Sequence, residues 1–247
     1  MGSQRTDRLR IGALIPSTNT VVEPEFAAML PTGVTAHAGR MLVRQPNIGT
    51  DALYKHLADQ MLDALESSVA NLVTCQPDHL SLCMSAVAFY GGAKGDLAVR
   101  DRLAAMTDVP FSTGPSALLS AVRAFGAERA VVLSPFQQEA QDETVRYFEE
   151  HDIEVVGSYA FLATSNVAIA TLSARAVRDA IAANDSDRAD LIMQVGTNLH
   201  MARLAAAAEW WLGKPVLHVN TVLAWEAMRA HGIEDRVEGF GSLLSEH

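Results

Sequence analysis

The sequence has few cysteines and no long apolar run. Only Cys75 and Cys83 occur among its 247 residues, which excludes a disulfide-stapled framework. No apolar stretch approaches the roughly 18 residues that a membrane-spanning helix needs. The first residues also lack the apolar segment of a secretion signal. We therefore expect a cytoplasmic protein with no membrane partner.

Basic residues are scarce as well. The 19 Lys and Arg against 29 Asp and Glu give a net charge of −10 at pH 7. Nucleic acids require a basic surface, so a nucleic-acid partner is not expected. A small anionic ligand stays compatible with this charge, because local backbone N–H groups can bind it.

Signals for a metal or a nucleotide phosphate are missing too. The eight histidines are scattered and show no HExxH or other metal-ligand spacing. The glycine-rich "GGAKGD" at 91–96 lacks the spacing of a Walker loop. We expect no metal and no cofactor.

Apolar residues make up 49% of the chain, and they fall in short runs. These runs are almost continuously apolar, as in parallel strands that are covered on both faces. Helical patterns at 52–73, 142–151 and 199–213 separate them, which predicts an α/β fold. The expected strands are 10–17, 34–42, 78–85, 109–113, 129–135, 153–161, 190–196 and 214–220.

The chain repeats its own pattern in order. "RIGALIPSTN" is echoed by "RAVVLSPFQ", and "DHLSLCMSA" by "DLIMQVGTN". "VPFSTGPSALLSAVRAFG" is echoed by "KPVLHVNTVLAWEAMRAHG", each closing on a glycine that suits a helix C-cap. This predicts two pseudo-symmetric lobes, each a short parallel sheet flanked by helices, with an active-site cleft between them. The first lobe would comprise 1–112 plus 217–247, and the second 113–216.

Ligands of α/β proteins bind where the carboxyl ends of the strands meet. The segments expected there are "PSTNT", "CMSA", "PFQQ", "TSN" and "GTN". The substrate-binding candidates within them are Ser17, Thr18, Asn19, Ser85, Ala86, Phe136, Gln137, Asn166, Thr197 and Asn198.

The ordered set "IPSTNTVVEPEF", "CMSAVAFYGG", "SPFQQ", "TSNVAIA", "GTNL" and "FGSLL" resembles the aspartate/glutamate racemase superfamily. The branch of maleate cis-trans isomerase and arylmalonate decarboxylase is the most similar. The resemblance implies a homo-oligomer and cofactor-independent chemistry at a carbon beside a carboxylate. It also implies one catalytic cysteine from each lobe, and a tyrosine next to the proline of "PFQQ".

The sequence departs from that pattern at all three positions. Counting six residues from Asp78 and Asp190 gives Met84 and Gly196 at the cysteine positions, and the tyrosine is Phe136. Cys83 lies one residue early, and a slip of one residue on a strand turns a side chain to the other face. A bulge would return its thiol to the cleft. The catalytic candidates are therefore Cys83, Met84 and Gly196, with Cys83 as either a packing residue or the nucleophile.

Several polar residues have a structural and a functional interpretation. Asn19, Ser85 and Asn166 would each cap a helix or contact a substrate carboxylate. Glu23 and Glu25 fit acid/base work or the dipole of a helix start. Trp210 and Trp211 fit helix packing or a subunit interface.

Three functions remain open at this point. The first is an isomerase, racemase or decarboxylase of this superfamily, acting on a small carboxylate or dicarboxylate. The second is a small-acid binding or regulatory protein that has lost catalysis. The third is a hydrolase of an amide or cyclic imide-like substrate, with water activated by Glu23 or His200.

Overall fold

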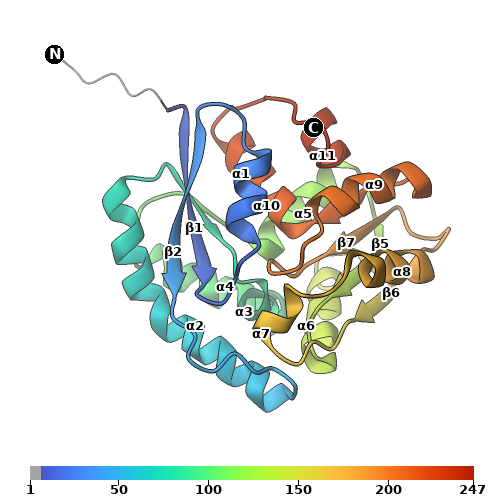
Figure 1. Cartoon of the computed structure of the whole chain (residues 1–247), viewed down its shortest axis with the longest axis horizontal. Helices are drawn as coiled ribbons and strands as arrows, with labels where there is room; N and C mark the ends of the chain where they lie inside the picture. The colour runs from blue at the N-terminus through green and yellow to red at the C-terminus, as the bar shows by residue number, and fades with distance from the viewer. Residues whose placement is uncertain (1–6) are drawn as a thin grey trace.

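The computed structural model describes residues 7–247, with Ala86 described by its backbone alone. Eight strands form two separate parallel sheets of four strands each, which lie side by side (Figure 1). Helices cover both faces of each sheet, as continuously apolar parallel strands require. The predicted α/β class and the two pseudo-symmetric lobes are confirmed.

The first sheet has the strand order β2-β1-β3-β4. Its central strand β1 pairs with β2 over eight residues, from the Leu9–Val34 pair to the Pro16–Met41 pair. The bounds are β1 (Leu9–Pro16), β2 (Val34–Met41), β3 (His79–Leu82) and β4 (Phe111–Thr113).

The second sheet has the order β6-β5-β7-β8, which is the order of the first sheet shifted by four. Its ladder is regular except for a bulge between Ala130 and Val131. The bounds are β5 (Arg129–Ser134), β6 (Glu154–Ala160), β7 (Leu191–Gln194) and β8 (Val216–His218). The division of the chain into 1–112 plus 217–247 and 113–216 stays a prediction.

Short connections join the strands to the helices. The helices are α1 (Val22–Met29), α2 (Asp51–Leu72), η1 (Val73–Cys75), α3 (Ser85–Phe89), α4 (Gly92–Ala104), α5 (Gly114–Ala124), α6 (Gln138–Glu149), α7 (Asn166–Ile169), α8 (Ala174–Asn184), α9 (Ala202–Leu212), α10 (Val219–Ala230) and α11 (Ser242–Glu246).

The internal repeat extends to individual hydrogen bonds. The carboxylate of Asp78, just before β3, accepts from the backbone N–H of Arg10 at 2.8 Å. The carboxylate of Asp190, just before β7, accepts from the N–H of Arg129 at 2.9 Å. Each aspartate thus ties the start of a strand to its central neighbour, which explains why both echoed segments begin with Asp.

The expected elements differ from the observed ones mainly at their ends. All eight predicted strands form, but β3 ends at Leu82 and β7 at Gln194, so 83–84 and 195–196 lie in connecting loops and Ser85 begins α3. The segment after Ser165 forms two helices, α7 and α8, because Ser173 caps the second one. Because the strands are shorter, "CMSA" runs from a loop into α3, and "GTN" forms a loop, each at the carboxyl end of its strand.

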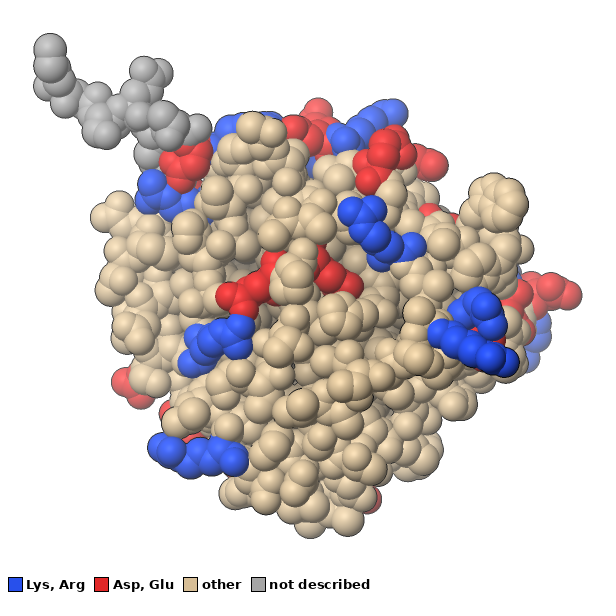
Figure 2. All heavy atoms as spheres, viewed as in Figure 1, with Lys and Arg blue, Asp and Glu red and all other residues tan. Residues whose placement is uncertain are grey.

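The surface carries its charges in scattered positions. On the face drawn in Figure 2, Lys and Arg side chains lie apart from one another and form no continuous basic area. Within residues 7–247, no helix is both long and apolar enough to cross a membrane.

Candidate active site

A small cavity lies where the ends of β1, β3, β5 and β7 approach one another. Its free volume is about 20 Å³, close to the space that one water molecule occupies. The space between the two lobes is thus almost filled by protein side chains. The lining residues are Pro16, Asn19, Met61, Met84, Ser85, Pro135, Phe136, Asn166, Ile169, Gly196, Thr197 and Asn198.

Asn19 combines both roles that the sequence left open. Its Oδ1 accepts from the N–H groups of Val21 and Val22 at 2.9 and 3.1 Å, so it satisfies donors at the start of α1. Its Nδ2 donates to the Thr197 hydroxyl at 3.3 Å, across to the other lobe. The capping bonds therefore fix the amide so that its N–H₂ end faces the cavity.

Asn198 forms the reciprocal bridge from the second lobe. Its Oδ1 accepts from the Thr20 N–H at 3.0 Å, and its Nδ2 donates to the Asn166 carbonyl at 2.7 Å. Asn166 in turn donates from Nδ2 to the Thr18 hydroxyl at 2.7 Å. The asparagines thus hold three segments together at the mouth of the cavity. Asn166 does not cap α7, because the side chain of Ser165 does so.

Several hydrogen-bond donors at the cavity have no protein acceptor. Among the described residues, none accepts from the backbone N–H groups of Gly196, Thr197 and Asn198. The Ser85 hydroxyl is buried and has no partner either, so it does not cap α3 as one interpretation had it. Three N–H groups and a hydroxyl around one cavity are suited to binding the oxygens of a carboxylate.

The other wall of the cavity is apolar. Met61, Met84, Phe136 and Ile169 line it, and each of them is buried. Phe136 is held by an edge-on contact with Tyr54, with ring centroids 5.7 Å apart. The cavity therefore has a polar and an apolar side, and none of its twelve lining residues titrates near neutral pH.

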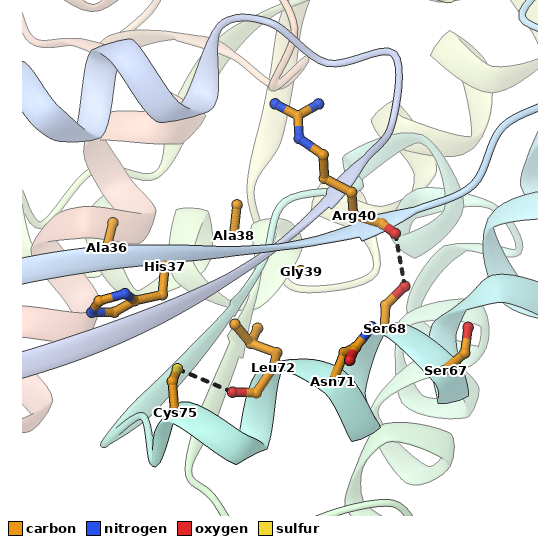
Figure 3. A pocket seen from close by; sticks show the side chains of 10 residues that line it. All are labelled: Ala36, His37, Ala38, Gly39, Arg40, Ser67, Ser68, Asn71, Leu72 and Cys75. Carbon is orange, nitrogen blue, oxygen red and sulfur yellow. Dashed lines mark hydrogen bonds between the residues drawn. The ribbon is translucent and has the colours of Figure 1, made fainter.

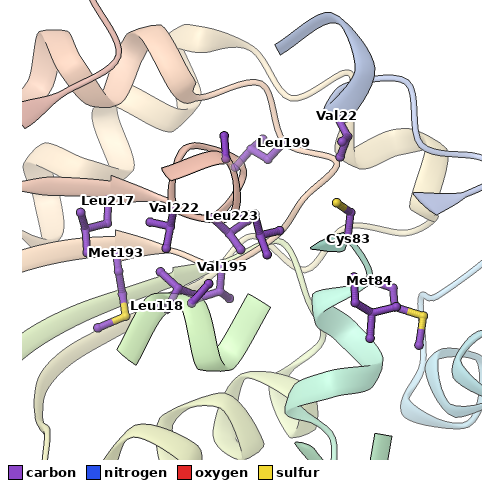
Figure 4. Packing of buried hydrophobic residues seen from close by; sticks show 14 of the residues in the cluster. Val22, Cys83, Met84, Leu118, Met193, Val195, Leu199, Leu217, Val222 and Leu223 are labelled. Carbon is purple, nitrogen blue, oxygen red and sulfur yellow. The ribbon is translucent and has the colours of Figure 1, made fainter. Parts of the chain in front are cut away.

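Cys83 does not reach this cavity. Figure 4 shows its side chain directed toward Val22, while the Met84 side chain leaves in a different direction. The thiol is fully buried and donates to the Ser81 carbonyl at 3.5 Å. Burial raises the pKa of the Cys83 thiol far above its ordinary value, which keeps it protonated. The packing interpretation of Cys83 accounts for these contacts.

Gly196 is closely packed, and it leaves no room for a side chain. A Cβ atom at this position would lie 2.4 Å from Cγ of Pro135 and 2.5 Å from its Cδ. A proline ring cannot swing aside as a flexible side chain does. The second lobe therefore excludes any thiol at position 196 unless Pro135 moves.

The remaining candidates lie around the cavity without lining it. Ser17 accepts from the Val43 N–H at 2.9 Å, and Gln137 donates from Nε2 to the Ala163 carbonyl at 2.8 Å. Thr18 contacts the site only through Asn166. The side chain of Ala86 lies outside what the structure describes. Glu23 pairs with Arg40 at the surface, and His200 lines a different cavity, so neither of them faces this site.

Some lining residues could not be predicted from the sequence. Met61 comes from the middle of the long helix α2, and Ile169 from the last turn of α7. Both have the appearance of ordinary core positions, and only the packing of distant elements brings them here. Pro16 and Pro135 were within reach of the sequence, since they begin the candidate segments "PSTNT" and "PFQQ".

A larger cavity, about 570 Å³, lies on the outer side of the first lobe (Figure 3). β2 and α2 line it, and its half-buried Cys75 donates to the Leu72 carbonyl at 3.1 Å. It shares no lining residue with the cavity between the lobes, so volume alone does not identify the functional site. Within residues 7–247, no three His, Cys, Asp or Glu side chains are grouped as a metal site.

The fold and the site define a two-lobed α/β protein with a cavity between its lobes, lined on one side by hydrogen-bond donors that have no acceptor among the described residues. A family model described as arylmalonate decarboxylase matches residues 11–244, and the chain therefore belongs to that family. The resemblance seen in the sequence is thereby confirmed.

Individual relatives agree over almost the whole length. A maleate isomerase of Pseudomonas putida is 27% identical over 97% of this chain and 98% of its own. An arylmalonate decarboxylase of Bordetella bronchiseptica is 24% identical over 98% of this chain and 99% of its own.

A solved structure shares the architecture. It is a Nocardia farcinica maleate cis-trans isomerase variant with a covalently bound succinylcysteine intermediate, and it has a TM-score of 0.84. It is 22% identical and covers 97% of this chain and 99% of its own, which establishes the fold alone.

Proposed function

We propose that the protein is a cofactor-independent enzyme that acts on a small carboxylate or dicarboxylate. Decarboxylation of a malonate-type diacid is the reaction that its cavity fits best. The observation that carries this proposal is the division of the cavity into a wall of unpaired donors and an apolar wall.

The two walls suit the two carboxylates of a malonate differently. One carboxylate would accept from the N–H groups of Gly196, Thr197 and Asn198 and from the Ser85 hydroxyl. The other would face Met84 and Phe136, where no donor replaces its hydration. That arrangement favours loss of the apolar-side carboxylate, because the resulting carbon dioxide is uncharged.

The step balances without a cofactor. The bond from the α-carbon to the unsolvated carboxylate breaks, and carbon dioxide leaves. The electron pair remains on the α-carbon and spreads into the retained carboxylate as an enediolate, which the donor wall stabilises. A proton from water then adds to the α-carbon. Since no lining side chain titrates near neutral pH, we expect protonation on both faces and a racemic product.

Isomerisation and racemisation fit less well. The relative from Nocardia farcinica has a covalently bound succinylcysteine, which requires a thiol beside the substrate. Here Met84 and Gly196 occupy the positions where the resemblance expects thiols, and the Cys83 thiol is buried elsewhere. A two-base proton transfer lacks both of its bases in this cavity.

A second candidate is a small-acid binding or regulatory protein. The absence of a titratable group among the twelve lining residues favours it. Binding without turnover would raise the melting temperature while every acid stays unaltered. A hydrolase is disfavoured, because Glu23 is paired with Arg40 and His200 lies at another cavity.

The cavity must open to admit any of these ligands. A volume of about 20 Å³ holds a single water and not a dicarboxylate. Met61 and Met84 have flexible side chains, and a change of their rotamers would enlarge the cavity. The closed cavity is consistent with a site that expels water before reaction.

Proton NMR in D₂O tests the proposal. The protein is incubated with aryl- and alkylmalonates, maleate, aspartate, glutamate and hydantoins. Carboxyl loss from a malonate with deuterium at the α-carbon supports it. Conversion of maleate to fumarate or deuterium exchange of an amino acid contradicts the preferred reaction. An inert panel whose members stabilise the protein supports the binding function.

We further propose that the protein works in the cytoplasm as a homo-oligomer. Trp210 is 90% exposed on α9, which is unusual for a tryptophan on a monomer surface. Light scattering during size-exclusion chromatography measures the mass, and a value of one chain contradicts the oligomer.

A further inference from the structure

A buried polar network lies behind the turn of Gly196, Thr197 and Asn198. It joins the carboxylate of Glu25 on α1 to His218 at the end of β8, Asn220 on α10 and Gln194 at the end of β7. His218, Asn220 and Gln194 are each at most 1% exposed. None of the four lines the cavity, so the network contacts the turn from its other side.

Glu25 is saturated with donors. Its Oε2 accepts from Nε2 of His218 at 2.9 Å and from Nδ2 of Asn220 at 2.7 Å. Its Oε1 accepts from the N–H groups of Met201 and Ala202, at 3.2 and 3.1 Å, at the start of α9. Glu25 is therefore a dipole partner of α9 rather than of its own helix.

Burial by itself raises the pKa of Glu25. The charge of His218 and the hydrogen bonds from His218, Asn220 and Ala202 lower it by more, so the pKa falls below its ordinary value. The side chain is thus a carboxylate at neutral pH. The opposite ring nitrogen, Nδ1 of His218, lies 2.8 Å from Oε1 of Gln194. Both ring nitrogens face acceptor oxygens, so the ring donates to both only with a proton on each nitrogen.

The network ends on two backbone carbonyls. Gln194 donates from Nε2 to the Gly196 carbonyl at 3.2 Å. Asn220 donates from Nδ2 to the Thr197 carbonyl at 3.0 Å. Across a trans peptide the next N–H points the opposite way, so these bonds direct the N–H groups of Thr197 and Asn198 away from the network. That side of the turn is the cavity.

A buried oxygen without a partner indicates that the surrounding contacts impose the orientation of the Asn220 amide. Oδ1 of Asn220 is buried and has no hydrogen-bond partner. An unpaired buried acceptor is unfavourable. The amide keeps this orientation because both of its N–H groups are used, one on the Glu25 carboxylate and one on Thr197.

We propose that Glu25 and His218 are positioning residues, which orient the N–H groups of Thr197 and Asn198 toward the substrate carboxylate. The role as a carboxylate site rests on the proposed function, whereas the orientation itself does not. The pair acts through Gln194 and Asn220 and touches no substrate.

The first measurement uses the unmodified protein. Nitrogen-15 NMR of the imidazole groups at pH 7 is expected to show both nitrogens of His218 protonated. A ring with a single proton overturns the proposal, because Gln194 or Glu25 would then lack a donor.

The second measurement compares Glu25→Gln with Glu23→Gln. Both changes remove one carboxylate from the same helical turn, but Glu23 is exposed and pairs only with Arg40. Glu25→Gln is expected to remove one imidazole proton from His218 and to shift the amide resonances of Thr197 and Asn198. Glu23→Gln is expected to leave both unchanged. Unaltered Thr197 and Asn198 amides in a folded Glu25→Gln protein overturn the proposal.

Ligand affinity then separates this proposal from the proposed function. Phenylmalonate is the probe, and Glu25→Gln is expected to weaken its binding about 10- to 100-fold, as misplaced donors do. Rescue by Glu25→Asp is expected to be partial. Suppose that Glu25→Gln shifts the amide resonances of Thr197 and Asn198, but the unmodified protein binds no diacid. That result supports the positioning role and overturns the proposed function. Altered amides with undiminished phenylmalonate binding overturn the positioning role.

Discussion

The hydroxyl of Thr197 donates to the backbone carbonyl of Cys83 at 3.0 Å, and this bond joins the site-forming turns of the two lobes. The same hydroxyl accepts from Nδ2 of Asn19 at 3.3 Å. Thr197 thus connects both first-lobe segments to the second lobe.

Thr197→Val removes this connection and leaves two buried polar groups unpaired. We expect the free energy of unfolding to fall by about 1–3 kcal/mol. Urea titration measures the change. Thr197→Ser keeps the hydroxyl and should remain within about 1 kcal/mol of the native protein, so an equal loss in both variants would contradict the role of the hydroxyl.

Cys83 is expected to be unreactive in the folded protein. Its thiol is buried, and burial raises its pKa, so little thiolate is available to an alkylating reagent. Mass spectrometry after iodoacetamide treatment should find Cys75 modified first, because Cys75 is only half-buried. Rapid labelling of Cys83 in the native protein would mean that the thiol reaches solvent.

Met84→Ala is expected to enlarge the cavity and admit diacids more readily. Met84 is 1% exposed, so the variant should also lose about 2 kcal/mol of stability or more. Met29→Ala is the control, since Met29 is equally buried in α1 and away from the cavity. Calorimetric titration with phenylmalonate should show tighter binding for Met84→Ala alone, and equal affinities would place Met84 outside the binding wall.

His79 makes stability depend on pH. Burial, and then the nearby His231, lowers the pKa of His79 from 6.5 to about 4. Above pH 6.5 neither the folded nor the unfolded form is charged at this residue. As the pH falls from 6.5 toward 4, the unfolded chain gains a proton that the folded chain does not, and stability falls by up to about 3 kcal/mol.

Urea unfolding at pH 7.5 and pH 5 measures this dependence. His79→Gln should flatten the slope between the two values, whereas the same change at the exposed His56 should not. An unchanged slope in His79→Gln would assign the pH dependence to other groups.

Much of the fold was accessible from the sequence because parallel strands are short, apolar and regularly spaced. The strand ends could not be placed, since hydrogen-bond partners decide them: Cys83 still pairs through its N–H with the Leu14 carbonyl, and Met84 no longer does. That difference of one residue sends the two side chains in different directions (Figure 4), so that Cys83 packs in the core and Met84 lines the cavity.

The site was predicted where one strand end carries its own polar residues, as with Asn19, Ser85 and Thr197. Residues were missed where a contact joins segments that lie far apart in the sequence. Glu25 and His218 are 193 residues apart, and neither sits in a motif that indicates the other. Only the packing of α1 against α10, the helix that follows β8 directly, brings them together.

The proposed enzyme decarboxylates its substrate without a thiol. The direct measurement is NMR of phenylmalonate in D₂O with a Cys75→Ala, Cys83→Ala double variant beside the unmodified protein. The predicted result is an equal rate of carboxyl loss in both proteins. The phenylacetate should carry deuterium at its α-carbon, added to either face of the enediolate, so that the monodeuterated product is racemic. Turnover by the unmodified protein that disappears in the folded double variant would contradict the account and return a cysteine to the mechanism.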